Sequence, residues 1–329
     1  METVLSGIRP TGNLHLGNYF GAVRNFVKMQ YDYKCFFFVA DLHSLTTYPT
    51  PEDLHGNIKR VLSEYLAAGI NPEAATLYIQ SDVPEVSQLY LLLNMNAYVG
   101  ELQRTTTFKE KVRTQPDNVN AGLLTYPVLM ATDIIIHRAN KVPVGKDQEQ
   151  NLEMTRKFAR RFNTMYKVEY FPLPEPYNFG EKLIKIPGLD GSGKMGKTEG
   201  NGIFLADEPD VIRKKVMRAV TDKGPEKPNQ KMPEPIKNLF TILDVVSSGD
   251  TKKYFLDQYK TCKIRYGDFK KQLAEDIIKV TTPIRERIIE IQSDDDYLKK
   301  VVKMGTEKAR ASASQTLKDV RNIIGYKPF

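Results

Sequence analysis

Two short segments of the 329-residue chain place glycine beside histidine or lysine in a way that suits a phosphate chain. The first reads Arg-Pro-Thr-Gly-Asn-Leu-His-Leu-Gly-Asn over residues 9–18. It stands between an expected strand at Val4 and an expected helix over residues 17–30, so backbone N–H groups and the positive helix end would meet at the tip of a sheet. Gly17 lets a nucleotide approach the backbone, and His15 and Asn18 can donate to phosphate oxygens. Taken alone, the segment fits a plain turn with a surface histidine about equally well.

The second segment reads Gly-Lys-Met-Gly-Lys-Thr over residues 193–198. Two lysines three residues apart on a glycine-rich loop can both point at one polyanion. Gly191, Gly193 and Gly196 let such a loop close over a ligand. Without the first segment, a solvated charged linker would be the better interpretation.

The elements around the first segment predict an α/β fold. An apolar run over residues 36–40 and a run over residues 76–80 are typical of strands buried on both faces. Helical patterns lie over residues 51–69, 86–103, 122–137 and 148–162, and a further strand is expected over residues 142–144. This order predicts a doubly wound parallel sheet, a Rossmann-like nucleotide-binding domain over residues 1–190 with an insertion at about residues 84–120.

The pattern changes after Pro187. The lysine loop, residues 188–202, is rich in glycine and lysine and is followed by amphipathic helical patterns over residues 209–221, 235–247, 254–259, 269–291 and 297–324. Residues 191–329 are therefore expected to form a smaller all-helical domain, hinged at the loop. Pro283 should break or kink the fourth helix, and the last helix is expected to pack back on the first domain.

Composition excludes several classes of protein. Apolar residues make up 41% and charged residues 27%, within the ordinary globular range. No apolar run approaches the ~20 residues that span a bilayer, and the N-terminus has no signal-peptide pattern, so the cytoplasm is expected. Cys35 and Cys262 lack ligand spacing, so no metal site within the protein is expected.

The net charge of +8 belongs entirely to the C-terminal part of the chain, residues 191–329. Residues 1–190 contain 20 basic and 20 acidic residues, while residues 191–329 contain 28 and 20. A basic surface confined to one domain suits a polyanion, because phosphate contacts dominate nucleic-acid affinity. On charge alone, a solvated lysine-rich surface is an equal alternative.

Taken together, the two segments resemble the HIGH and KMSKS signatures of class I aminoacyl-tRNA synthetases, in the right order. The resemblance narrows to the tryptophanyl-tRNA synthetase family through residues 10–19, Phe-Lys-Glu-Lys at 108–111, the segment 123–134, and Val-Pro-Val-Gly-Lys-Asp-Gln at 142–148. The second signature departs from the family pattern, because Gly196 removes a hydroxyl from the loop while both lysines remain.

The resemblance implies roles for individual residues. His15, Lys111, Lys194 and Lys197 would be catalytic, the histidine at the reacting phosphate and the lysines at the departing pyrophosphate. The residues that would bind ATP are Arg9, Pro10, Thr11, Gly17, Asn18, Gly145, Lys146, Asp147, Gln148, Ile186, Lys194, Met195, Gly196, Lys197 and Thr198. The tryptophan pocket would be lined by Leu5, His43, Met130 and Asp133, with Asp133 accepting the indole N–H.

The implied reaction activates L-tryptophan with ATP and transfers it to the 3′-terminal adenosine of tRNA(Trp). It needs no protein nucleophile, since the amino-acid carboxylate attacks the α-phosphate and catalysis is positioning and electrostatics. ATP is a substrate, and Mg²⁺ is expected on its phosphates. The resemblance also implies a homodimer, with the insertion at residues 84–120 as interface, and the helical domain as the part that binds the tRNA anticodon.

Three alternatives remain open at this point. A tyrosyl-tRNA synthetase is the nearest, although Leu5 stands where tyrosyl enzymes usually carry a tyrosine. A non-catalytic RNA-binding relative is disfavoured by the presence of His15, Lys194 and Lys197. A nucleotidyltransferase acting on a small acceptor would leave the basic helical domain without a purpose.

Overall fold

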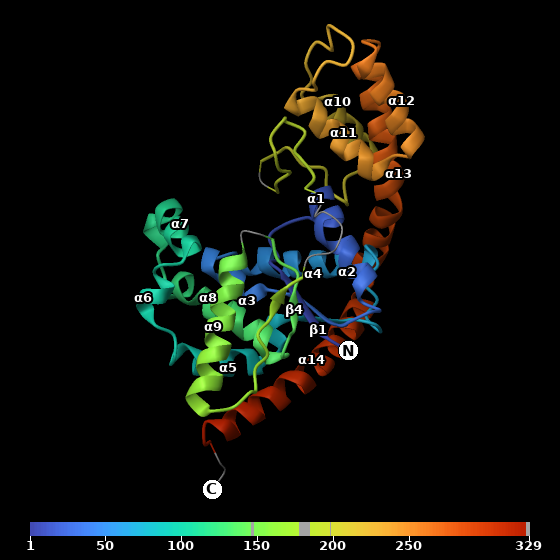
Figure 1. The fold of residues 1–329 in the computed structure, drawn as a ribbon. Coiled ribbons are helices and arrows are strands. Elements are labelled where there is room, and N and C mark those ends of the chain that lie inside the picture. The colour runs from blue at the N-terminus through green and yellow to red at the C-terminus, as the bar shows by residue number, and fades with distance from the viewer. Residues whose placement is uncertain (146–147, 178–184, 198, 327–329) are drawn as a thin grey trace.

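The computed structural model describes residues 1–145, 148–177, 185–197 and 199–326, and it divides into a sheet-containing body and a helical bundle (Figure 1). The sheet has five parallel strands in the order β3-β2-β1-β4-β5. Their bounds are β1 Thr3–Ile8, β2 Lys34–Val39, β3 Thr76–Ile79, β4 Lys141–Val142 and β5 Glu175–Pro176. This order confirms the predicted doubly wound nucleotide-binding fold.

Two hydrophobic clusters cover the two faces of the sheet. Successive side chains of β1 point to opposite faces, so Val4 belongs to one cluster and Leu5 to the other. On the Val4 side pack α2 (Arg24–Met29) and α4 (Pro51–Ala67), and on the Leu5 side α5 (Pro84–Asn94), α8 (Ala121–Ile136) and α9 (Glu149–Tyr166). Both faces are thus buried, which explains the continuous apolar run in β2.

Several predicted boundaries were wrong. The helix expected over residues 17–30 is α1 (Leu16–Asn18), a π-helical turn (Tyr19–Val23) and α2. The helix expected over residues 86–103 ends with α5 at Asn94, and α6 (Val99–Leu102) follows. The strand expected over residues 142–144 ends at Val142, because Pro143 has no N–H for the ladder. Shorter helices complete this body: α3 (Asp41–Ser44) and α7 (Thr106–Thr114), with 3₁₀ turns at Leu45–Thr47, Gln80–Asp82 and Pro116–Asn118.

The helical bundle consists of α10 (Pro209–Met217), α11 (Glu234–Val246), α12 (Gly249–Lys260) and the first part of α13 (Tyr266–Ser293). Helix α13 packs on α10 and α11 and also on α4 of the sheet-containing body. Of the break or kink expected at Pro283, the break was wrong, since α13 continues through this residue. Pro283 lies on the exposed side of the helix, where water can satisfy the carbonyl that the proline leaves without a donor.

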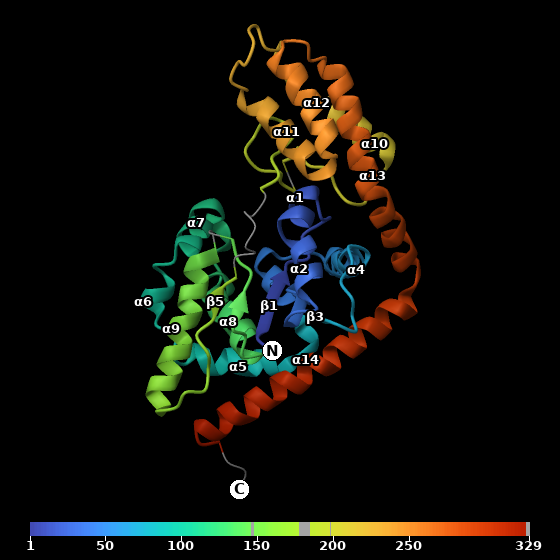
Figure 2. The same ribbon diagram turned by 45° about the vertical axis from the view of Figure 1, so that its right-hand side comes forward.

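The last helix, α14 (Asp295–Ile323), returns along the sheet-containing body and packs against β3 and α5 (Figure 2). The contact with β3 is so close that a Cβ on Gly305 would lie 1.7 Å from the Leu77 carbonyl oxygen. No helix among residues 1–145, 148–177, 185–197 and 199–326 has the length and apolarity needed to cross a membrane.

Candidate active site

A cavity of about 440 Å³ opens at the carboxyl ends of β1, β2 and β4, where ligands bind in open α/β sheets. Its wall includes these residues with predicted roles: Leu5, Arg9, His43, Lys111, Met130, Asp133, Gly145 and Gln148. The remaining wall residues come from β1, β2 and the residue after it, the 3₁₀ turn Leu45–Thr47, α7, α8, and the end of β4 with the segment that follows it. The predicted tryptophan-pocket residues are thus brought together with part of the predicted ATP set.

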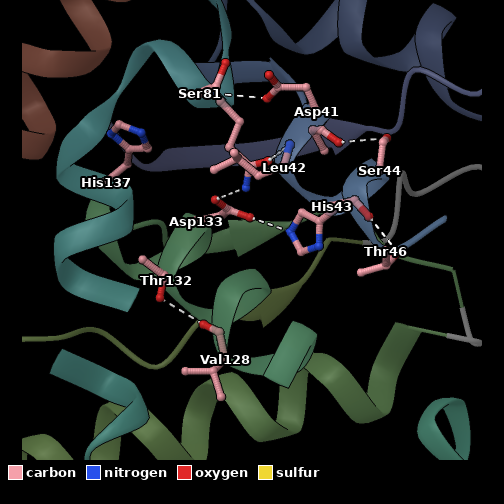
Figure 3. Close-up of polar contacts among 12 residues, drawn as sticks. Asp41, Leu42, His43, Ser44, Thr46, Ser81, Val128, Thr132, Asp133 and His137 are labelled. Atoms are coloured by element: carbon pink, nitrogen blue, oxygen red, sulfur yellow. Dashed lines mark hydrogen bonds and ion pairs between the residues drawn. The ribbon is translucent and has the colours of Figure 1, made fainter. Parts of the chain in front are cut away.

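Asp133 of α8 is the buried carboxylate of this cavity, with 2% of its surface exposed. His43 of α3 faces it, with 2.9 Å between His43 Nε2 and Asp133 Oδ2, as Figure 3 shows. Gln80 donates to Asp133 Oδ1 at 2.7 Å. Burial raises the pKa of Asp133, while the bonds from His43 and Gln80 act in the opposite direction. Each oxygen therefore already accepts one bond, and a carboxylate has acceptor sites to spare for a ligand.

Gln80 is a residue that the sequence analysis missed. It lies directly after β3, is completely buried, and also accepts the Leu42 N–H through Oε1 at 3.2 Å. Its amide therefore ties α3 to Asp133. The signal that could have found it is its position, since polar residues at the carboxyl ends of parallel strands tend to serve the ligand site.

His15 forms the cap of α1 in a reciprocal arrangement with Asn18. The Asn18 N–H donates to His15 Nδ1 at 3.2 Å, and the His15 N–H donates to Asn18 Oδ1 at 3.1 Å. Because Nδ1 accepts a bond, a neutral His15 carries its proton on Nε2, which is then free to act as a donor. Burial, followed by the charges of Lys197 and Lys194, lowers the pKa of His15 to about 4. His15 is therefore a neutral donor near pH 7 rather than a cation.

Gly17 has a structural reason in addition to the expected approach of a nucleotide. A Cβ at this position would lie 2.8 Å from atoms of the His15 ring and 3.7 Å from Cβ of Ile186. The glycine therefore leaves room for the histidine ring in its capping position.

The lysine loop folds against the first signature. Lys197 Nζ donates to the Gly12 carbonyl oxygen at 3.3 Å. Residues 203–205 pair with residues 14–16 through the Leu16 N–H to Ile203 O and Leu205 N–H to Leu14 O bonds, at 2.9 Å each. Met195 is 1% exposed, and its N–H donates to the Ile186 carbonyl oxygen. The loop is therefore held against the first signature around Met195 and Lys197, while Lys194 is exposed to solvent.

Of the three loop glycines expected to give conformational freedom, only Gly191 adopts a positive φ, of 84°. The exposed lysine, Lys194, and the half-buried Lys197 both lie close enough to His15 to depress its pKa. Arg9 Nε is buried and has no hydrogen-bond partner within the described residues. A cationic group in that state fits an anionic ligand that is held there.

The other predicted ATP-binding residues divide into two groups. Pro10 is buried and Thr11 is exposed in the loop after β1, and Gly196 lies in the folded lysine loop. Lys146, Asp147 and Thr198 lie outside the described residues, so their predicted roles rest on the sequence alone.

Comparison with known proteins gives a consistent result over nearly the whole chain. Residues 2–282 match the profile of the tRNA synthetases class I (W and Y). The chain is 66% identical to a tryptophan–tRNA ligase of Porphyromonas gingivalis, covering 99% of this chain and 100% of that protein. A tryptophan–tRNA ligase of Clostridium tetani is 41% identical, over 99% of this chain and 96% of its own. A crystal structure of tryptophanyl-tRNA synthetase from Campylobacter jejuni complexed with ADP and tryptophan superposes with a TM-score of 0.89 at 32% identity, covering 98% of this chain and 99% of that chain.

Proposed function

Because this chain belongs to the family of class I tRNA synthetases for tryptophan and tyrosine, we propose that it activates L-tryptophan with ATP and transfers it to the 3′-terminal adenosine of tRNA(Trp). It is a tryptophan–tRNA ligase by this assignment. The observation that carries the proposal is the meeting of the two signature segments, where Lys197 donates to Gly12 beside a neutral His15. Two relatives named tryptophan–tRNA ligase, of which this chain covers 100% and 96%, support tryptophan as the substrate.

The activation step is a nucleophilic displacement at the α-phosphorus of ATP. The tryptophan carboxylate oxygen forms a bond to the α-phosphorus of ATP, the bond between the α-phosphorus and the bridging oxygen breaks, and pyrophosphate leaves with the electron pair. We assign Lys111, Lys194 and Lys197 to the charge that accumulates on pyrophosphate, and Arg9 to the ATP phosphates. His15 would donate through Nε2–H to a phosphate oxygen, which requires no change of its protonation state.

Tryptophan itself would lie in the cavity against Leu5 and Met130, whose side chains offer only apolar surface. Asp133 would accept the indole N–H, while His43 and Gln80 hold its carboxylate in place. A tyrosine hydroxyl would find no partner at Leu5, and an under-paired buried hydroxyl costs ~1–3 kcal/mol.

Mg²⁺ is proposed as the ion that accompanies ATP. Among the residues that the structure describes, no three His, Cys, Asp or Glu side chains gather as a metal site. Apart from the neutral His15, the side chains assigned to the phosphates are cationic, so the ion would be held by phosphate oxygens and water, as is usual for Mg²⁺ bound to nucleotides. It would neutralise part of the triphosphate charge when bound.

The helical part is proposed to contact tRNA near the anticodon. Residues 191–329 carry the whole basic excess, and the loop between α10 and α11 exposes Lys223, Lys227 and Lys231. Phosphate contacts by such lysines would give salt-dependent affinity. Since tRNA and ATP are substrates of cytoplasmic protein synthesis, we propose the cytoplasm as the place of action.

The insertion at residues 84–120 is proposed as the interface of a homodimer. Leu91, Met95, Tyr98 and Val99 are each more than half exposed there, and Leu45 and Tyr48 add apolar surface next to the cavity. Exposed apolar side chains of this kind are typical of an interface between subunits. Light scattering during gel filtration should give the mass of a dimer, and Met95→Glu with Tyr98→Glu should convert it to a monomer.

Exchange of labelled pyrophosphate into ATP, run with tryptophan, tyrosine and phenylalanine, tests the proposed function. We expect exchange that depends on tryptophan, followed by charging of tRNA(Trp). Efficient exchange with tyrosine would favour the sister specificity, and exchange with none of the three would contradict the proposal as a whole.

A further inference from the structure

Asn201 lies at the centre of the lysine loop and is buried, with 4% of its surface exposed. Its Oδ1 accepts the Gly196 N–H at 3.0 Å. Its Nδ2 lies 3.2 Å from both Asp190 carboxylate oxygens, 3.0 Å from Ser192 Oγ and 3.2 Å from the Lys194 carbonyl oxygen. One amide therefore contacts the backbone on both sides of Met195, between the two signature lysines.

The loop is built around this amide. A Cβ on Gly188 would lie 2.3 Å from Asn201 Nδ2 and 2.5 Å from Asp190 Oδ1, so no side chain fits there. The Asn201 carbonyl oxygen also accepts the Leu189 N–H at 3.0 Å. Bonds from Ser192, together with a bond from Asn201, hold the pKa of Asp190 below its ordinary value, so this partner of the amide is ionised at neutral pH.

The same loop is fastened to both parts of the protein. On one side, the pairing of residues 203–205 with residues 14–16 begins two residues after Asn201 and leads to the first signature. On the other side, Asn238 of α11 donates to the Ser192 carbonyl oxygen at 2.9 Å. Gly196 has no side chain that could hold the loop, so its N–H bond to Asn201 is the contact that fixes its backbone.

We propose that Asn201 is a positioning residue for the activation step, because its amide fixes the loop backbone that carries Lys194 and Lys197. Asn201 touches no reacting atom in this role. It determines where the two ammonium groups stand when charge develops on pyrophosphate. This inference rests on the proposed function, which assigns both lysines to that charge.

The first test is Asn201→Asp. The variant keeps the shape and the oxygen that accepts from Gly196, but it loses both N–H donors and places a second carboxylate beside Asp190. Since a misplacement of about 1 Å at a reacting centre costs about 100-fold, we expect single-turnover adenylate formation to slow by roughly that factor. Tryptophan affinity, measured by isothermal titration calorimetry, should change by less than about twofold, since no pocket residue is altered.

The decisive variant is the double exchange Asp190→Asn with Asn201→Asp. It removes the carboxylate pair and restores one bond between an amide and a carboxylate in the opposite direction. Such a bond corresponds to a recovery of about 10-fold in the activation rate over Asn201→Asp alone. Asn201→Ala, which adds no charge, should slow activation in the same direction and serves if the aspartate variant does not fold.

Asn163 provides a matched control. Its side chain on α9 clamps another segment by accepting the N–H groups of Tyr170 and Phe171 and donating to the Phe171 carbonyl oxygen. Asn163→Asp should lower the melting temperature without changing the activation rate. Asn201 variants that only lower the melting temperature, or a double exchange without recovery, would overturn the inference. Wild-type protein that lacks tryptophan-dependent exchange would instead contradict the proposed function.

Discussion

Asp133→Asn is the change that best tests how the cavity reads its substrate. The substitution keeps the volume of the side chain and removes its charge. Both carboxylate oxygens accept bonds here, from His43 at 2.9 Å and from Gln80 at 2.7 Å. An amide offers one acceptor oxygen and one donor group, so one of these two partners would then face a donor.

The magnitude follows from the bonds concerned. A hydrogen bond to a charged acceptor is worth about 1.5–3 kcal/mol, which corresponds to roughly 10-fold to 150-fold in kcat/KM. If Asp133 accepts the indole N–H, tryptophan loses this amount and phenylalanine, which has no N–H, loses much less. The ratio of kcat/KM for tryptophan to that for phenylalanine should therefore fall by roughly 10-fold to 150-fold.

Pyrophosphate exchange with both amino acids measures the ratio in wild type and variant. Gln80→Leu is a useful control, because it removes a bond to Asp133 while leaving the carboxylate in the cavity. Equal losses for tryptophan and phenylalanine in Asp133→Asn would refute the assigned role and would show that Asp133 serves only to hold His43 and Gln80.

Further expectations concern the lysines, the histidine, the last helix and the tRNA surface. Lys194→Ala and Lys197→Ala should each slow single-turnover activation by about 100-fold to 1000-fold and leave tryptophan affinity nearly intact. The reason is that the two lysines stabilise charge that appears only in the transition state. Unchanged rates in both variants would exclude this role. The pKa of His15 is about 4 in the folded protein and near 6.5 in the unfolded chain. The free energy of unfolding that neutral His15 contributes should therefore be present above pH 6.5 and decline as the pH falls towards 4. NMR titration should show a higher pKa of His15 in Lys197→Ala than in wild type. Gly305→Ala should lower the free energy of unfolding, measured in urea, by about 1–3 kcal/mol, although alanine has the better helix propensity. The reason is that the alanine Cβ would collide with the Leu77 carbonyl oxygen. A stabilised variant would contradict the close packing of α14. Glutamates in place of the three exposed lysines between α10 and α11 should weaken tRNA binding and reduce its salt dependence while adenylate formation continues, and unaffected charging at low tRNA concentration would exclude this surface.

The sequence was sufficient for the parallel sheet because its central strands are buried on both faces and read as apolar runs. It could not predict β5, whose two residues, Glu175 and Pro176, are exposed and carry no apolar signal. The hydrogen bonds of the π-helical turn at Tyr19–Val23 span only one residue more than those of an α-helix. Its apolar residues therefore recur at nearly the same spacing, and the apolar pattern predicted one continuous helix.

For the site, glycine, histidine and lysine at fixed spacing were enough to predict where the phosphates bind, and this assignment stays a prediction. The residues that hold these groups were not predictable in the same way. Gln80 and Asn201 are neutral amides, a residue type that is usually found at the surface. Their roles depend on hydrogen bonds to Asp133 and Asp190, which the sequence pattern does not show. The tautomer of His15 likewise depends on the hydrogen bond from the Asn18 N–H to Nδ1, which the spacing of residues does not predict.

The packing of α14 on β3 has a consequence for how the protein is made. Strand β3 is the edge of the sheet, and the helix that lies along it, Asp295–Ile323, follows all five strands in the sequence. A ribosome releases the N-terminus first, so this edge stays uncovered until α14 has also emerged. Uncovered edges pair readily with other strands, which makes the nascent chain most prone to aggregation during that interval. We therefore expect that a polypeptide stopped before Asp295 would need a chaperone to stay dispersed, although all five strands would already be complete.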